Sequence, residues 1–142
     1  MDSVENNQQF AERRQRLVEL RERLLHLHKA LIDSERVGYE LVFGSVGSAV
    51  DLLQLLTRDP WFAWLRPVSE LIVRMDETLD GPEPITAELL DGFLKTARTL
   101  FTPAENGDDF ATHYSEALQR DPNVILAHGD MVKSFPPPKR PS

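Results

Sequence analysis

The chain has 142 residues, no cysteine and a formal net charge of −7. A chain of this length forms one domain and buries roughly two-thirds of its unfolded surface, so it can hold a core without disulfides. The lack of cysteine excludes thiolate catalysis, cysteine zinc sites and iron–sulfur clusters.

The first predicted element is a long helix over residues 5–43, ended by Gly44. Its main apolar positions repeat with heptad spacing: Phe10, Leu17, Leu20, Leu24, Leu27 and Leu31. A second set follows one position later and makes the stripe wider than a two-stranded coiled coil uses: Val18, Leu25 and Ile32. Such a rod approaches 60 Å at about 1.5 Å per residue, which is longer than a compact domain of this size. We therefore expect a second copy to cover part of the stripe, at Leu17, Leu20, Leu24 and Leu27.

A second helix is predicted over residues 45–57, with Ser45 as its N-cap. Its expected inward face is Val46, Ala49, Val50, Leu53 and Leu56, and Leu52 and Leu55 widen it. A helix that is apolar on so much of its circumference is expected in the middle of a bundle.

The sequence Arg-Asp-Pro occurs at 58–60 and again at 120–122. At both places the aspartate can cap a helix whose first residue is the proline. The turn after the first of these corners carries Trp61, Phe62 and Trp64, whose rings cannot all face one way. Either this turn closes one end of the bundle with both indoles buried, or Trp61 and Trp64 form a second contact patch.

Pro67 predicts a kink or a restart of the helix. Three further helices are predicted to begin near Pro67, at Thr86 and at Asp108. A last helix follows the second Arg-Asp-Pro corner. In the first of them, Glu70 and Arg74 are expected to pair on the outside. Residues 135–142 contain four prolines, which predicts a disordered tail after a domain spanning residues 1–134. No segment alternates as a strand does, so the predicted fold is all-α: a bundle of about five to six helices with a long N-terminal helix.

The charged residues do not predict nucleic-acid binding or a metal site. The arginines of the first helix, at 13, 14, 16, 21 and 23, alternate with acids such as Glu12 and Glu19 at pairing distance, and the rest of the chain is acidic. His113 and Glu116 could share a metal ion, but a carboxylate bundle needs that motif twice, and the second copy is missing. We therefore expect no nucleic-acid partner, metal or cofactor.

His128 is the strongest candidate for ligand chemistry, because it lies on the apolar side of the last predicted helix. No nucleophile accompanies it, and a hydrogen-bonded core histidine is the simpler interpretation. The alternative is a pocket for a small ligand or metal near His128 and Tyr114.

Three segments, HLHKALIDSERVGYELVFG, DPWFAWLRPVSELIV and EALQRDPNVILAHGD, resemble a group of uncharacterised bacterial helical proteins. The resemblance covers about residues 26–130. It implies a bacterial source and an autonomous helical domain, and it carries no activity or functional residue.

Together these features predict a non-catalytic helical-bundle protein that acts through protein–protein contacts and self-association, as a homodimer. The polar N-terminus shows no secretory signal, and no uninterrupted apolar stretch reaches membrane length, so we expect a soluble, cytoplasmic protein with no membrane partner.

Overall fold

The computed structural model describes residues 2–103 and 107–136, with side chains from residue 6 onward. Within these ranges the chain forms six α-helices and one 3-10 helix, and no strand. The elements are α1 (Asp2–Phe43), α2 (Ala49–Arg58), η1 (Pro60–Leu65), α3 (Arg66–Asp80), α4 (Ala87–Leu100), α5 (Asp109–Arg120) and α6 (Pro122–Val132). The predicted all-α fold with a long first helix is confirmed.

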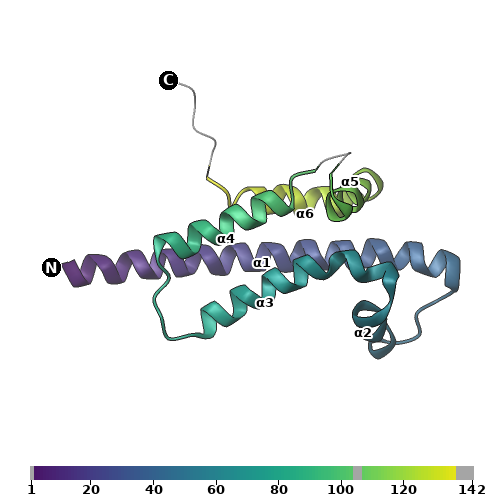
Figure 1. The fold of residues 1–142 in the computed structure, drawn as a ribbon, viewed down its shortest axis with the longest axis horizontal. Coiled ribbons are helices and arrows are strands. Elements are labelled where there is room, and N and C mark those ends of the chain that lie inside the picture. Colours follow the sequence, from purple (N-terminus) through teal and green to yellow (C-terminus); the bar gives the residue numbers. More distant parts are fainter. Residues whose placement is uncertain (1, 104–106, 137–142) are drawn as a thin grey trace, which may run out of the picture.

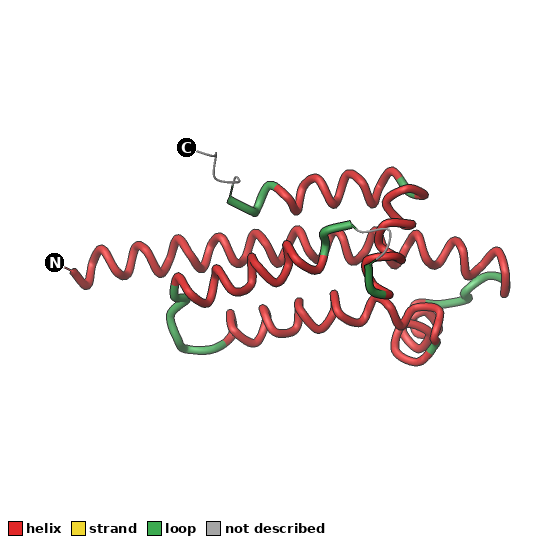
Figure 2. Tube along the Cα trace, turned by 45° about the horizontal axis from the view of Figure 1, so that its top comes forward, coloured by secondary structure: helices red, strands yellow, loops and turns green. Residues whose placement is uncertain are grey.

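Helix α1 is the spine of the molecule. Its 42 residues span about 63 Å at 1.5 Å per residue, without a break. Helix α3 runs along one side of it, and α4, α5 and α6 lie on the other side, while α2 folds back beneath its C-terminal end (Figure 1). In the second view α4 lies between α1 and α3, α6 lies on the other side of α1, and both ends of α1 extend past the helices packed on it (Figure 2).

The heptad leucines of α1 form the centre of the core. Leu17, Leu20, Leu24 and Leu27 are each 0% exposed. They pack in one cluster with apolar side chains of α3, α4 and α6, including Leu71, Met75, Leu90, Val124 and Met131. The predicted contact of these four leucines with a second copy is therefore wrong, because helices of the same chain flank the wide stripe on both sides and cover it.

The helix ends follow the local capping chemistry. Asp59 accepts a hydrogen bond from the backbone N–H of Trp61 at 2.9 Å, and Asp121 does the same for Asn123 at 2.9 Å. Gly44 ends α1 with a φ of +94°, a conformation that favours glycine. The second helix begins later than predicted, because Ser48 rather than Ser45 accepts the capping hydrogen bond from Asp51.

Helix α2 does not lie in the middle of the bundle, contrary to the prediction. None of its residues is buried, and Val50 and Leu53 are 64% and 61% exposed. Its other side packs on η1 through the half-buried Leu55 and Leu56. The helix is short and sits beyond the bundle, so only one side of its wide apolar face finds a neighbour.

A buried acid ties the α5–α6 corner to α1. Glu35 is 8% exposed, and its Oε1 accepts a hydrogen bond from Arg120 Nη2 at 3.0 Å. The same guanidinium donates to Ser34 Oγ at 3.2 Å. The arginine neutralises a carboxylate that would otherwise be buried without a partner.

We expect Arg120→Ala to lower the free energy of unfolding by about 1–3 kcal/mol, because it leaves Glu35 buried and charged without its partner. Urea unfolding followed by circular dichroism measures this loss. Adding Glu35→Gln should recover part of it, since the buried group is then neutral. An Arg120→Ala variant as stable as the wild type would contradict this role for the pair.

The packed part of the chain includes the start of the predicted tail. Phe135 is half-buried against the core, and the Arg98 guanidinium lies 5.2 Å from the centre of its ring. Arg98 also donates to the Pro136 carbonyl at 2.8 Å. An unpacked tail beginning at residue 135 is therefore wrong for Phe135, and residues 137–142 lie outside the described part.

Candidate functional site

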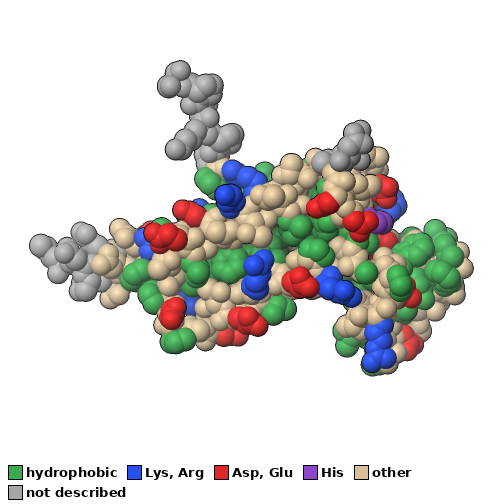
Figure 3. Space-filling view, viewed as in Figure 1, with side chains coloured by type: hydrophobic (Ala, Val, Ile, Leu, Met, Phe, Trp, Pro, Cys, Tyr) green, Lys and Arg blue, Asp and Glu red, His purple; other side chains and the backbone are tan. Residues whose placement is uncertain are grey.

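Exposed apolar side chains gather where the end of α1 meets α2. We call this surface the apolar end, and it consists of Val37, Leu41, Val42, Phe43, Val50 and Leu53. Their exposed fractions run from 61% for Val37 to 83% for Leu41. Figure 3 shows hydrophobic side chains clustered at this end of the molecule. Phe43 of α1 and Leu55 of α2 line a common cavity there, so the two elements are neighbours.

The apolar end exists because the stripe of α1 continues past the helices that cover it. Positions 20, 27, 34 and 41 are seven residues apart and share one face of α1. At Ser34 the corner between α5 and α6 supplies the last cover, through Arg120. Leu41, one heptad further, is the most exposed of the large apolar side chains. The other end of α1 also projects, but Asn6, Asn7, Gln8 and Gln9 are polar and suit water.

The tryptophan turn mainly closes the bundle. Trp64 is 6% exposed, so it offers no contact surface, and the prediction of an interface there is wrong for this residue. Trp61 is half-buried and meets Tyr39 and Phe43 edge-on, with ring centres 5.9 and 6.0 Å apart. Gly38 allows this approach, since a Cβ there would lie 3.3 Å from the Trp61 ring. Trp61 thus supports the apolar end from beneath.

The arginine cluster of α1 fastens the bundle together. Arg14 donates to the Leu79 carbonyl at 2.7 Å, Arg21 pairs with Asp76 of α3, and Arg23 donates to Ser134 Oγ at 2.6 Å. The expected pairs within α1 from Glu12 and Glu19 are not formed in the described structure. These arginines are used in internal contacts, which leaves little of the cluster for phosphate groups.

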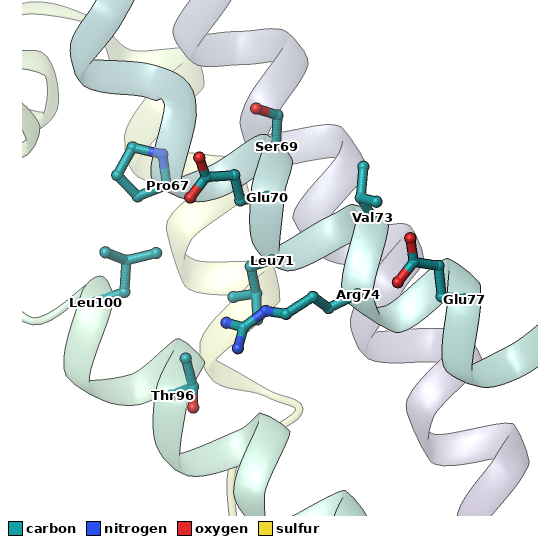
Figure 4. A pocket seen from close by; sticks show the side chains of 9 residues that line it. All are labelled: Pro67, Ser69, Glu70, Leu71, Val73, Arg74, Glu77, Thr96 and Leu100. Carbon is teal, nitrogen blue, oxygen red and sulfur yellow. The ribbon is translucent and has the colours of Figure 1, made fainter.

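An open groove lies between α3 and α4, with a volume of about 710 Å³. Arg74 extends from α3 across this groove toward α4, and Glu70 also lines the groove, nearer to Pro67 (Figure 4). The expected ion pair between Glu70 and Arg74 is not formed, although both side chains are described. Charges of both signs line the groove, with Glu77 as a second acid, so it favours no single class of ligand.

His128 and Tyr114 are brought together, as one predicted pocket required. The Tyr114 hydroxyl lies 2.6 Å from His128 Nδ1. Tyr114 is 0% exposed, and burial raises its pKa, so the hydroxyl stays protonated. No other acceptor for this proton is found among the described residues, so the hydroxyl donates to Nδ1, and the ring proton of neutral His128 sits on Nε2. His128 lines a cavity, whereas Tyr114 lies behind it.

Folding stability should fall in mild acid because of two histidines. Burial lowers the pKa of His28 and of His128 from the ordinary value of 6.5. Below that value the unfolded chain binds more protons than the folded chain, so stability is lost as the pH falls from 6.5 toward the folded-state pKa values. Each pKa unit by which folding lowers a histidine contributes about 1.4 kcal/mol to this loss of unfolding free energy.

We expect urea unfolding to show a lower stability at about pH 5 than at about pH 7.5, and a smaller difference in the double variant His28→Gln/His128→Asn. Asparagine keeps an acceptor for the Tyr114 hydroxyl. His26→Gln replaces the exposed neighbouring histidine and serves as the control. We expect it to show the same difference in stability between the two pH values as the wild type. An unchanged pH dependence in the double variant would contradict the assignment.

His113 and Glu116 do not form the metal site that their spacing allows. His113 stacks on Trp64 with ring centres 5.2 Å apart, and its Nε2 lies 3.5 Å from Asp109. Among the described residues, no group of three or more histidine, aspartate or glutamate side chains could hold a metal ion.

Comparison with protein-family models, with curated proteins and with solved structures finds no match for this chain. No activity, ligand or partner is therefore transferred from a relative. In the described part of the chain, every helix is too short or too polar to span a bilayer.

Proposed function

We propose that this protein is a non-catalytic helical module that works by protein–protein contact, and that it forms a dimer through the apolar end. The exposed apolar surface at the end of α1 and on α2 carries this proposal. Large apolar side chains left exposed together at one end of a folded chain typically mark an interaction site. The sequence also predicts self-association, but through the leucine stripe. We propose that the contact is instead made by the apolar end, where the stripe continues without cover from the chain's own helices.

The apolar end is large enough for a dimer contact. Burying one Leu or Val side chain removes roughly 100 Å² of apolar surface, since it is worth about 1.5–3 kcal/mol at ~25 cal/mol per Å². Its six side chains, exposed by about two-thirds, offer roughly 400 Å² on the same scale. A standard interface buries about 800 Å² per partner, a little over half of it apolar. The apolar end thus matches the apolar share of one such interface.

The charge distribution favours a second copy at this place. Two chains of charge −7 repel each other over most of their surfaces. Residues 41–50 contain no charged side chain, although charged residues make up 27% of the whole chain. The flanking Glu40 is neutralised by Arg36, with Arg36 Nε 3.0 Å from Glu40 Oε1. Two copies can therefore meet at residues 41–50 without bringing acid against acid, and the exposed Asp51 lies directly after this run.

Sedimentation equilibrium over a range of micromolar concentrations tests the proposal. We expect a reversible monomer–dimer equilibrium, with a limiting mass of twice the 16.2 kDa of the chain. Raising the salt concentration should not weaken the dimer, because the contact is apolar and salt screens the repulsion between the two acidic chains. A monomer at the highest concentration would refute self-association.

The alternative function, a bundle that binds a small ligand or a metal, is favoured at one place only. For metal binding, the described residues contain no cluster of three or more side chains that could hold the ion. For small-ligand binding, there is a cavity beside His128.

We further propose that the protein acts in the bacterial cytoplasm, which its lack of cysteine suits.

A further inference from the structure

A small cavity lies where the end of α4, helix α6 and the segment after α6 meet. Its volume is about 380 Å³, within the range of small-molecule sites. Phe101, Pro103, Val132 and Phe135 supply apolar walls. Such walls provide binding energy for an apolar body but do not select its charge.

Two residues with hydrogen-bond donors line this apolar space. The first is His128, whose ring proton is on Nε2 because Tyr114 donates to Nδ1 at 2.6 Å. Nε2 has no protein partner among the described residues and is not sealed from solvent. The second is Arg98, which Phe135 and the Pro136 carbonyl hold at the rim. The Pro136 carbonyl takes one of five guanidinium N–H groups, so Arg98 keeps donors for a ligand.

No acid is found among the described residues that line this cavity, unlike the other cavities described. None of its lining residues is Asp or Glu, in a chain that has 23 of them. Each of the other four cavities is lined by at least two acidic residues. Among the described residues, the cavity beside His128 is thus the one of these five that offers positive charge and N–H donors with no competing carboxylate.

We propose that this cavity is a binding site for a small carboxylate with a compact apolar body. The apolar part lies against Phe101, Val132 and Phe135, and the carboxylate accepts hydrogen bonds from the Arg98 guanidinium and from Nε2–H of His128. A guanidinium and a carboxylate form paired, charge-assisted hydrogen bonds, and these are stronger within apolar walls than in water. This site is separate from the apolar end and independent of self-association.

Three probes of similar shape test the proposal: benzoate, the neutral benzamide and the cationic benzylamine. Binding is followed by NMR through the His128 ring signals during titration at neutral pH. We expect benzoate to shift these signals saturably, benzamide to bind at least tenfold more weakly, and benzylamine not to bind. Equal binding of benzoate and benzamide, or no saturable shift with benzoate, overturns the proposal.

Two variants locate the site. Arg98→Gln should weaken benzoate binding at least tenfold, while Arg58→Gln, the same change on α2 at the other end of the molecule, should leave it unchanged. The amide spectrum shows whether each variant is folded. If Arg98→Gln loosens the segment after α6, Arg98→Lys keeps the charge and should retain part of the affinity. Benzoate binding that is indifferent to both changes at position 98 overturns the assignment.

Discussion

Replacing Leu24 by alanine is expected to lower the free energy of unfolding by about 3 kcal/mol, within the 2–5 kcal/mol range for large-to-small changes in a core. Leu24 is 0% exposed and lies in the middle of the spine helix, among side chains from three other helices. Urea unfolding followed by circular dichroism gives the difference directly.

The matched control for Leu24→Ala is Leu25→Ala. Leu25 is the next residue along the same helix and is 39% exposed, so its replacement should cost about 1 kcal/mol or less. If the leucine stripe is the chain's own core, the difference between the two variants will not depend on protein concentration. A cost for Leu24→Ala that grows with concentration would place Leu24 in a contact between copies instead.

The double substitution Leu41→Asp/Leu53→Asp is expected to abolish dimerisation without unfolding the chain. Both side chains are largely exposed, at 83% and 61%, so folding should change by only about 0.5 kcal/mol. In a dimer each copy would place two carboxylates in an apolar contact against their symmetry mates, which costs several kcal/mol. Sedimentation equilibrium should then show only monomer at concentrations where the wild type is dimeric.

Leu126→Asp provides the control for that experiment. Leu126 is 68% exposed on α6, away from the apolar end, so the same substitution removes a similar apolar side chain from another surface. We expect it to leave the dimer intact. Equal loss of dimer from Leu126→Asp would show that general solubility or another face governs the association.

The helix boundaries were predictable where a local chemical reason fixes them. Asp59 and Asp121 cap helices ahead of proline, and Gly44 ends α1, as the sequence indicates. At α2 both Ser45 and Ser48 are of a type that caps helices, and the structure shows that Ser48 accepts the capping hydrogen bond. Local signals are reliable when one residue type alone suits the position.

Which molecule covers an apolar face was not predictable from the sequence. The spacing of Leu17 and Leu24 shows that they need neighbours, but it is the same for a neighbour in the same chain and for one in a second copy. The cover comes from α3, α4 and α6, whose positions depend on loop lengths and packing. The signal for the apolar end was present as the uncharged run at 41–50, directly after the long helix.

The cavity beside His128 was partly predictable. The apolar helical face gave His128 as a candidate, and Tyr114 lies 14 residues before it in the sequence. Arg98 gave no signal, because it belongs to another helix and is positioned by Phe135 and Pro136, which were assigned to an unpacked tail. Such a site is built from three separate segments, and spacing along the chain does not reveal it.

Paramagnetic relaxation between two copies tests the central claim, which is that a second copy covers the uncovered end of α1. The chain has no cysteine, so Ser45→Cys accepts a single nitroxide label beside the apolar end. Labelled, unenriched chain is mixed with unlabelled, ¹⁵N-enriched chain, and amide signals of the enriched copy are compared before and after reduction of the nitroxide. The account predicts selective broadening in residues 37–53. Broadening centred on α4 or α6, or none at concentrations where the dimer forms, would contradict it.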